Sequence, residues 1–360
     1  MARAQARDTQ PTLSLRPTAR RWTVYAGWGG LVVVGVALLA YPHMVSRFQV
    51  SLATEAIYLA VWALSLHLML GYLGMLSFGH AAYIGLGAYT VALLLRKTDI
   101  PYGVAFLAAP VVSAIGAAVV GALCIRLRHA VYFAMLTLAF AQIIYTVTFQ
   151  WYSFTGGDNG VVGFGRNIPA ALRTNPTNLY YFSLAVGVVC LALIWLIVRS
   201  PFGVMLRTIR ENPERAEAIG VPVQWVRFLT FVLAGAFAGV AGALLATFQR
   251  AVFPDTLHWS RSGEVIIMVL LGGMDHFLGP VVGAVAFLLL NKYSTEFTQY
   301  WQLLIGLVLL AIVLVFRGGI LGFGEDAWRF MARRLARPVH GQTAPPTEPV
   351  ATAPAREEPS

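Results

Sequence analysis

Charged residues are scarce in this 360-residue chain: Asp, Glu, Lys and Arg make up 12% of it, and hydrophobic residues make up 58%. A soluble domain carries about 25% charged residues, so the composition excludes an ordinary soluble protein and indicates several membrane crossings. The formal net charge of +10 comes from arginines that cluster at the ends of apolar runs, as membrane topology requires. The charge therefore gives no reason to expect a nucleic-acid partner.

Cysteine is nearly absent. Cys124 and Cys190 lie within or at the end of apolar runs, so we expect buried small residues and no disulfide. No cluster of His, Cys, Asp or Glu has the spacing of metal ligands, and no Ser-His-Asp arrangement can be argued from spacing alone. The sequence therefore predicts no metal site and no enzymatic activity.

Lysine is also rare, and Lys97 and Lys292 are the two that occur. A nucleotide-binding loop needs Gly, four residues and then Gly-Lys-Ser/Thr, because backbone amides and the lysine hold the phosphates. Arg96 precedes Lys97 and Asn291 precedes Lys292, so neither fits. We expect no cofactor in this chain, and any ATP and Mg must be bound by partner subunits.

Apolar runs dominate the rest of the chain. They predict an all-α fold, a polytopic membrane helical bundle of about ten transmembrane helices of about 20 residues each. With the N-terminus inside, ten crossings place the arginines of 199–228 and 317–337 on the cytoplasmic side, as the positive-inside rule requires. The expected crossings are 22–41, 49–70, 73–95, 101–125, 130–150, 179–198, 229–250, 262–274, 276–291 and 300–316.

The domain organisation follows from these runs. Residues 1–21 lack the short apolar stretch and cleavage site of a signal peptide, so we expect a retained cytoplasmic tail. The transmembrane domain is expected to cover 22–320, with a polar cytoplasmic segment at 199–228. Residues 338–360 are rich in Pro, Ala, Thr and Glu, and we expect a disordered cytoplasmic tail.

The polar segment contains the pattern of a short, bounded helix. Asn212 is a good N-cap, Pro213 suits the first helical position, and Gly220 can adopt the left-handed conformation that ends a helix. Ala216 and Ile219, three residues apart, would form a small apolar spot among charges. The pattern fits either an ordinary cytoplasmic loop or a helix that docks onto a partner.

Glycine interrupts two apolar segments, 71–89 and 271–280. Gly74-Met75 and Gly273-Met274 are each followed by a Phe and further glycines at similar spacing. One interpretation is an internal repeat whose interrupted helices mark a transport path. The alternative is close helix packing through small residues. The second segment is either a tight turn between two short crossings or a broken helix.

Ionisable residues within the apolar runs are few, and each costs about 2.5–3.5 kcal/mol at mid-bilayer, so each is a functional candidate. Glu55 and Glu264 could instead reach the interface, and His67 could be structural. This scarcity argues against a proton-coupled carrier. Because the ends of interrupted helices suit carboxylate and ammonium groups, we select path candidates at the two glycine-rich segments. These candidates are Ser77, Gly79, His80, Asp275, His276 and Gly279.

A turn-rich stretch, TGGDNG at 155–160, lies in a predicted outer loop. It is either a tight turn or a surface that contacts a partner or the entering solute. Asp158 and Asn159 are the candidate contact residues.

Several motifs together resemble the permease subunits of branched-chain amino acid ABC importers, the LivM type in particular. The similarity covers about residues 50–322. The motifs are specific as a set and weak singly. They are GMLSFGHAAY at 74–83, YFAMLTLAF at 132–140, TGGDNG at 155–160, SPFG at 200–203, RENPERAEAIG at 210–220 and GPVVG at 279–283.

The resemblance implies a multi-pass subunit in the bacterial inner membrane, with both termini cytoplasmic, that forms the translocation path for branched-chain or related amino acids. It implies three kinds of partner besides the lipid bilayer: a second permease of the LivH type, two ATPase subunits and a periplasmic solute-binding protein. It also implies that 207–220 is the coupling segment that docks into an ATPase. The residues expected there are Arg207, Arg210, Glu211, Glu214, Arg215, Ala216, Ile219 and Gly220.

The chain departs from the family pattern at one place. The family usually has Gly-Gly-Met-Gly-Thr where this chain has Gly-Gly-Met-Asp-His at 272–276. Urea permeases share much of the pattern, so a urea or amide permease is an alternative. An ion-coupled secondary carrier is the alternative from another class, but such a carrier needs no capped cytoplasmic docking helix.

Overall fold

The computed structural model describes most of the apolar part of the chain. Sequence predictions for both tails, and for most of the first and last expected crossings, lie outside the described residues. The described residues are 35–124, 130–297, 303, 306–307, 310 and 318–323.

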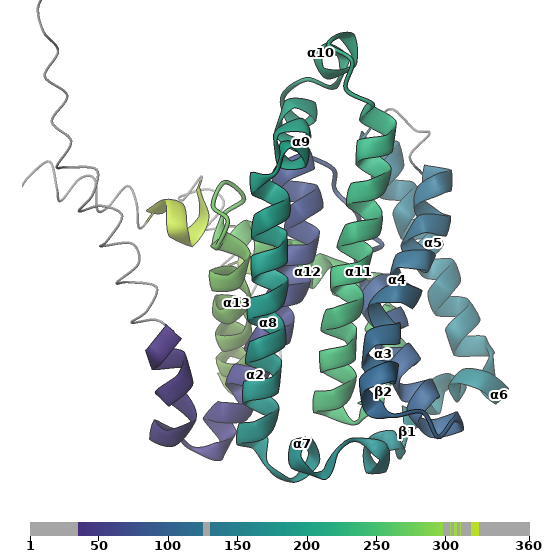
Figure 1. Ribbon diagram of the computed structural model, residues 1–360, viewed down its shortest axis with the longest axis vertical. Helices are drawn as coiled ribbons and strands as arrows, with labels where there is room; N and C mark the ends of the chain where they lie inside the picture. Colours follow the sequence, from purple (N-terminus) through teal and green to yellow (C-terminus); the bar gives the residue numbers. More distant parts are fainter. Residues whose placement is uncertain are drawn as a thin grey trace, which may run out of the picture.

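Long α-helices form a single bundle (Figure 1). Residues 35–44 are helical and precede α2. The π-helix η1 continues α2. The long helices and η1 are α2 (Arg47–His67), η1 (Leu68–Leu73), α3 (His80–Lys97), α4 (Tyr102–Cys124), α5 (Ala130–Gln150), α8 (Pro176–Arg199), α11 (Val223–Gln249), α12 (Trp259–Gly272) and α13 (Gly279–Phe297).

Short elements lie at the two ends of the bundle, which we call the α10 end and the β1 end (top and bottom of Figure 1). The α10 end carries α9 (Pro201–Glu211) and α10 (Pro213–Ala218). The β1 end carries one two-stranded antiparallel pair, in which Val161 pairs with Val252. The other short elements are α6 (Tyr152–Thr155), η2 (Gly157–Asn159), β1 (Val161–Val162), η3 (Phe164–Asn167), α7 (Ala170–Thr174), β2 (Ala251–Val252) and η4 (Pro254–Leu257).

Five of the described helical stretches are long and apolar enough to cross a membrane: Arg47–Leu73, Tyr102–Cys124, Val131–Gln150, Pro176–Arg199 and Val223–Gln249. The prediction of an all-α polytopic bundle is therefore confirmed. The expected limits of the crossings 101–125 and 130–150 also agree with α4 and α5. The count of ten crossings stays a prediction.

Small residues hold α11 at the centre of the bundle, where it packs against α2, α3 and α4. A Cβ at Gly242 would overlap the carbonyl oxygen of Ile84, and one at Gly87 would overlap that of Gly239. The helix axes can approach this closely only because no side chain separates them. Close packing through small residues therefore accounts for Gly87.

An irregular segment, 74–79, separates η1 from α3. The expected crossing 73–95 begins too early, because α3 starts at His80. Ser77 is buried, and its hydroxyl accepts a hydrogen bond from the Gly79 amide at 3.3 Å. A Cβ at Gly79 would overlap the carbonyl oxygen of Thr137 in α5. Protein atoms thus cover Met75, Ser77 and Gly79 of this non-helical segment, whereas Gly74 is exposed.

The second glycine-rich segment forms a helical hairpin, so the broken-helix alternative is wrong. Helices α12 and α13 pack against each other, and the turn 273–278 joins them. A Cβ at Gly283 would overlap the carbonyl oxygen of Met268. With 14 residues, α12 is about 21 Å long and shorter than a bilayer core of about 30 Å.

Candidate functional site

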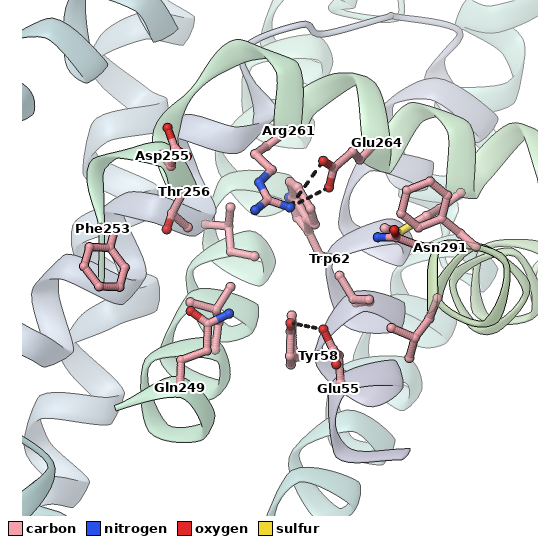
Figure 2. A pocket seen from close by; sticks show the side chains of 16 residues that line it. Glu55, Tyr58, Trp62, Gln249, Phe253, Asp255, Thr256, Arg261, Glu264 and Asn291 are labelled. Carbon is pink, nitrogen blue, oxygen red and sulfur yellow. Dashed lines mark hydrogen bonds and ion pairs between the residues drawn. The ribbon is translucent and has the colours of Figure 1, made fainter. Parts of the chain in front are cut away.

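A cavity of about 300 Å³ lies among α2, α3, α11, α12 and α13, and Figure 2 shows its side chains from close by. Gln249, the last residue of α11, and Phe253, which follows β2, both line it. The cavity therefore lies toward the β1 end. Its volume is at the lower limit for small-molecule sites, which is about 300 Å³.

Two hydrogen-bonded polar pairs line this cavity. On α2, the Tyr58 hydroxyl donates to Glu55 Oε1 at 3.1 Å. On α12, Arg261 Nη1 lies 2.9 and 3.2 Å from the two carboxylate oxygens of Glu264. In each pair the two residues are three positions apart on one helix, a spacing that puts their side chains on the same face. Asp255 adds a third carboxylate.

Trp62 of α2 also lines the cavity (Figure 2). Its side chain is buried, and its indole Nε1 has no hydrogen-bond partner among the residues that the structure describes. A buried donor without a partner costs about 1–3 kcal/mol. Because this nitrogen atom is itself buried, it is not exposed to the cavity.

Besides Gln249, Thr256 and Asn291, the remaining wall consists mainly of aliphatic and aromatic side chains. They come from α2, α3, α11, α12 and α13, so the cavity exists only when these five helices pack together. The cavity therefore combines charges of both signs with an apolar surface. The apolar residues are Leu59, Ile84, Leu245, Met268, Phe287 and Leu288.

The predicted path residues lie in two groups, one at the start of α3 and one at the turn between α12 and α13. Ser77, Gly79 and His80 are buried at the start of α3, where His80 Nε2 lies 2.7 Å from Ser65 Oγ. Next to them, the Ala81 amide donates to Ser262 Oγ of α12 at 2.9 Å. None of the three lines the cavity.

Asp275, His276 and Gly279 lie at the turn between α12 and α13. Asp275 Oδ1 forms an ion pair with Nη2 of Arg210 in α9 at 3.2 Å, which places this turn at the α10 end. Whether the six candidates share one path, and the part that each plays in transport, stays a prediction.

The predicted helix in the polar segment is present as α10. Asn212 Oδ1 accepts from the Arg215 amide at 3.0 Å, and Pro213 is the first helical residue. Gly220, with φ of +90°, adopts the left-handed conformation that was expected of it. The caps thus act as the sequence indicated.

The expected apolar spot on this helix needs one correction. Ala216 is 0% exposed, whereas Ile219 is 74% exposed. The reason is that α10 packs on α9 and α11, and the Val221 amide folds back to the carbonyl of Ala216. Ala216 thus belongs to the fold and cannot contact a partner. The other candidates exposed on this segment are Arg207, Arg210, Glu211, Glu214, Arg215 and Gly220.

Asp158 and Asn159 are exposed on η2 at the β1 end. Asn159 Nδ2 donates to the Tyr152 hydroxyl at 2.8 Å. After Gly160, Val161 and Val162 form β1 and pair with β2, which directly precedes Phe253 in the cavity wall. The outer turn is therefore joined to the cavity by backbone hydrogen bonds.

Sequence reasoning missed most of the polar cavity residues. Glu55 and Glu264 were candidates, but Tyr58, Asp255 and Arg261 were not. The i, i+3 pairing of Arg261 with Glu264 at the start of an expected crossing was an available signal.

Comparison with known proteins identifies the family of this chain. The family model described as "Branched-chain amino acid transport system / permease component" matches residues 48–313. The high-affinity branched-chain amino acid permease LivM of Salmonella typhimurium is 28% identical over 311 residues, which cover 80% of this chain and 73% of that protein.

Two further permeases match shorter parts of this chain. A probable LivH permease of Methanocaldococcus jannaschii is 28% identical over 172 residues, which cover 44% of this chain and 51% of that protein. The guanosine permease NupQ of Bacillus subtilis is 25% identical over 129 residues, covering 35% and 39%. No solved structure matches the chain. The match over residues 48–313 shows that this multi-pass membrane protein belongs to the branched-chain amino acid transport permease family.

Proposed function

We propose that this chain is one permease subunit of an ATP-driven importer for branched-chain or related aliphatic amino acids. The observation that carries the proposal is the cavity at the β1 end, where Glu55, Arg261 and Glu264 face an apolar wall. An aliphatic amino acid has two charges and an apolar side chain, so it matches such a lining. Relatives named LivM and LivH support the same cargo class.

The apolar part of the cavity favours amino acids over the alternative cargo, urea. Urea has no apolar surface, so aliphatic and aromatic side chains such as Leu59, Met268 and Phe287 would not contribute to its recognition.

The α10 end is proposed to face the cytoplasm and to contact an ATPase subunit. Exposed charges and Ile219 at this end support the assignment. In this arrangement ATP and Mg bind to two partner ATPases and not to this chain. The proposed contact residues are Arg207, Glu211, Glu214, Arg215, Ile219 and Gly220.

The β1 end then faces outward. Asp158 and Asn159 on the exposed turn η2 would contact a solute-binding protein that delivers the amino acid. The proposal includes a second permease of the LivH type, ten crossings, cytoplasmic termini and a bacterial inner membrane. An internal repeat is supported at one point, because Gly74 and Gly273 each end a helix with a positive φ, 75° and 105°.

The test is uptake by the assembled importer. The chain is co-expressed with its second permease, ATPases and binding protein, and the complex is reconstituted in proteoliposomes. ATP-dependent accumulation of labelled leucine would support the proposal. ATP-dependent uptake of urea without leucine would replace the cargo, and leucine uptake driven by an ion gradient without ATP would favour a secondary carrier.

A further inference from the structure

We propose that the cavity at the β1 end binds the three parts of an aliphatic amino acid separately: Arg261 binds the carboxylate, Glu55 binds the ammonium group, and the apolar wall holds the side chain. This inference rests on the proposed function and assigns recognition to individual residues of this chain.

Arg261 can bind a second carboxylate while it keeps its first. A guanidinium has five N–H donors, and only Nη1 is used by Glu264. Within the described ranges, the other side-chain nitrogens of Arg261 make no hydrogen bond, and the side chain is 49% exposed. Glu264 therefore fixes the orientation of the guanidinium and leaves its Nη2 and Nε donors available to a ligand.

The N-terminus of α12 reinforces a carboxylate at this position. Arg261 lies in the first turn of the 14-residue helix α12, whose N-terminus favours negative charge.

Glu55 is the ammonium acceptor because it lies on the opposite wall, on α2 (Figure 2). Its Oε1 accepts the Tyr58 hydroxyl, which fixes the carboxylate, and its Oε2 accepts no hydrogen bond from any described residue.

The aliphatic side chain would lie against Leu59, Ile84 and Met268, which come from α2, α3 and α12. Branched and straight aliphatic chains bury apolar surface there, whereas a charged side chain would lose hydration without gaining a partner.

Protection of an introduced thiol measures this recognition without the binding protein. The two native cysteines are buried, so Thr256→Cys in the cavity lining places one accessible thiol in this chain. In the purified complex, we expect leucine to slow its reaction with a membrane-impermeant methanethiosulfonate. Leucinamide, which lacks the carboxylate, and 4-methylpentanoate, which lacks the ammonium group, should each need at least tenfold higher concentrations.

Variants in the Thr256→Cys background assign the groups. Arg261→Gln should raise the half-protecting leucine concentration at least tenfold and remove the preference for leucine over leucinamide. Glu55→Gln should remove the preference over 4-methylpentanoate. Arg166→Gln, an exposed arginine on η3 at the β1 end, is the matched control and should change neither. Co-purification of the partner subunits checks that each variant is folded.

The outcomes separate this inference from the proposed function. ATP-dependent leucine uptake by the wild-type complex without protection of Cys at position 256 would overturn the inference alone. Equal protection by leucine and leucinamide would remove the role of Arg261, and equal protection by leucine and 4-methylpentanoate would remove that of Glu55. Absence of both uptake and protection would overturn the proposed function as well.

Discussion

Arg210 in α9 and Asp275 in the turn between α12 and α13 form an ion pair with 3.2 Å between Nη2 and Oδ1. The same guanidinium donates through Nη1 to the carbonyl of Gly71 in η1. Arg210 thus joins the expected coupling segment to both glycine-rich segments of the chain. Sequence reasoning assigned Arg210 to an ATPase interface, whereas its side chain binds within the permease.

The ion pair between Arg210 and Asp275 predicts a role in coupling ATP hydrolysis to transport. The side chains of Arg210 and Asp275 are 38% and 71% exposed, and exposed ion pairs contribute about 0–1 kcal/mol to stability. Asp275→Asn should therefore leave assembly and ATP hydrolysis intact. We expect a roughly fivefold loss of leucine uptake per ATP hydrolysed, which corresponds to a coupling free energy of about 1 kcal/mol.

The measurement is paired transport and phosphate release in proteoliposomes. Arg199→Gln is the control, because Arg199 is exposed and stacks on Trp195 at 4.2 Å. An unchanged ratio of uptake to hydrolysis in Asp275→Asn would remove the coupling role of the ion pair.

The exposed apolar residue on the polar segment gives a second prediction. Ile219 is 74% exposed, so Ile219→Asp should not disturb the fold of this chain. It should abolish ATPase association and uptake together, because a carboxylate would lose its hydration in an apolar interface. Ile219→Val keeps the apolar contact and should retain both.

Co-purification of the ATPase subunits with a tagged permease measures the association. Normal association of the Ile219→Asp complex would show that the ATPase binds elsewhere. The buried Ala216 is unsuitable for this test, since a large residue there would disturb the packing of α10.

Local patterns in the sequence were enough to predict several helices and the caps of α10. The residues that line the cavity could not be predicted, because the packing of distant helices brings them together. The crossing 130–150 has the same limits as α5, and the Asn212 cap forms as expected. The start of α3 was misplaced because apolar composition cannot distinguish helix from a buried irregular segment. The cavity joins Glu55 to Arg261, about 200 residues apart in the chain, and no local pattern specifies such a pairing.

The orientation of the bundle is a third prediction. Asp158 is exposed at the β1 end and Glu211 at the α10 end. In whole cells, a membrane-impermeant thiol reagent should label Asp158→Cys and should reach Glu211→Cys only after the membrane is permeabilised. The native Cys124 and Cys190 are buried and should give little background. Labelling of Glu211→Cys alone in intact cells would reverse the proposed orientation.

The glycines that hold α11 in place give the last prediction. A Cβ at Gly242 would overlap the carbonyl oxygen of Ile84 and would also meet the amide of Ala88. These are backbone atoms, so the helices must move apart. We expect Gly242→Ala to lower the free energy of unfolding by about 1–3 kcal/mol, the usual cost of overpacking. Thermal unfolding of the detergent-purified protein measures this change.

Gly103→Ala is the matched control for that substitution. Gly103 lies in the first turn of α4, has no heavy atom within 4 Å of an added Cβ, and does not have a positive φ. Alanine there reduces the freedom of the unfolded chain, so stability should be unchanged or should rise by up to about 1 kcal/mol. Equal transition temperatures for Gly242→Ala and Gly103→Ala would show that α3 and α11 are not held together by contact at Gly242.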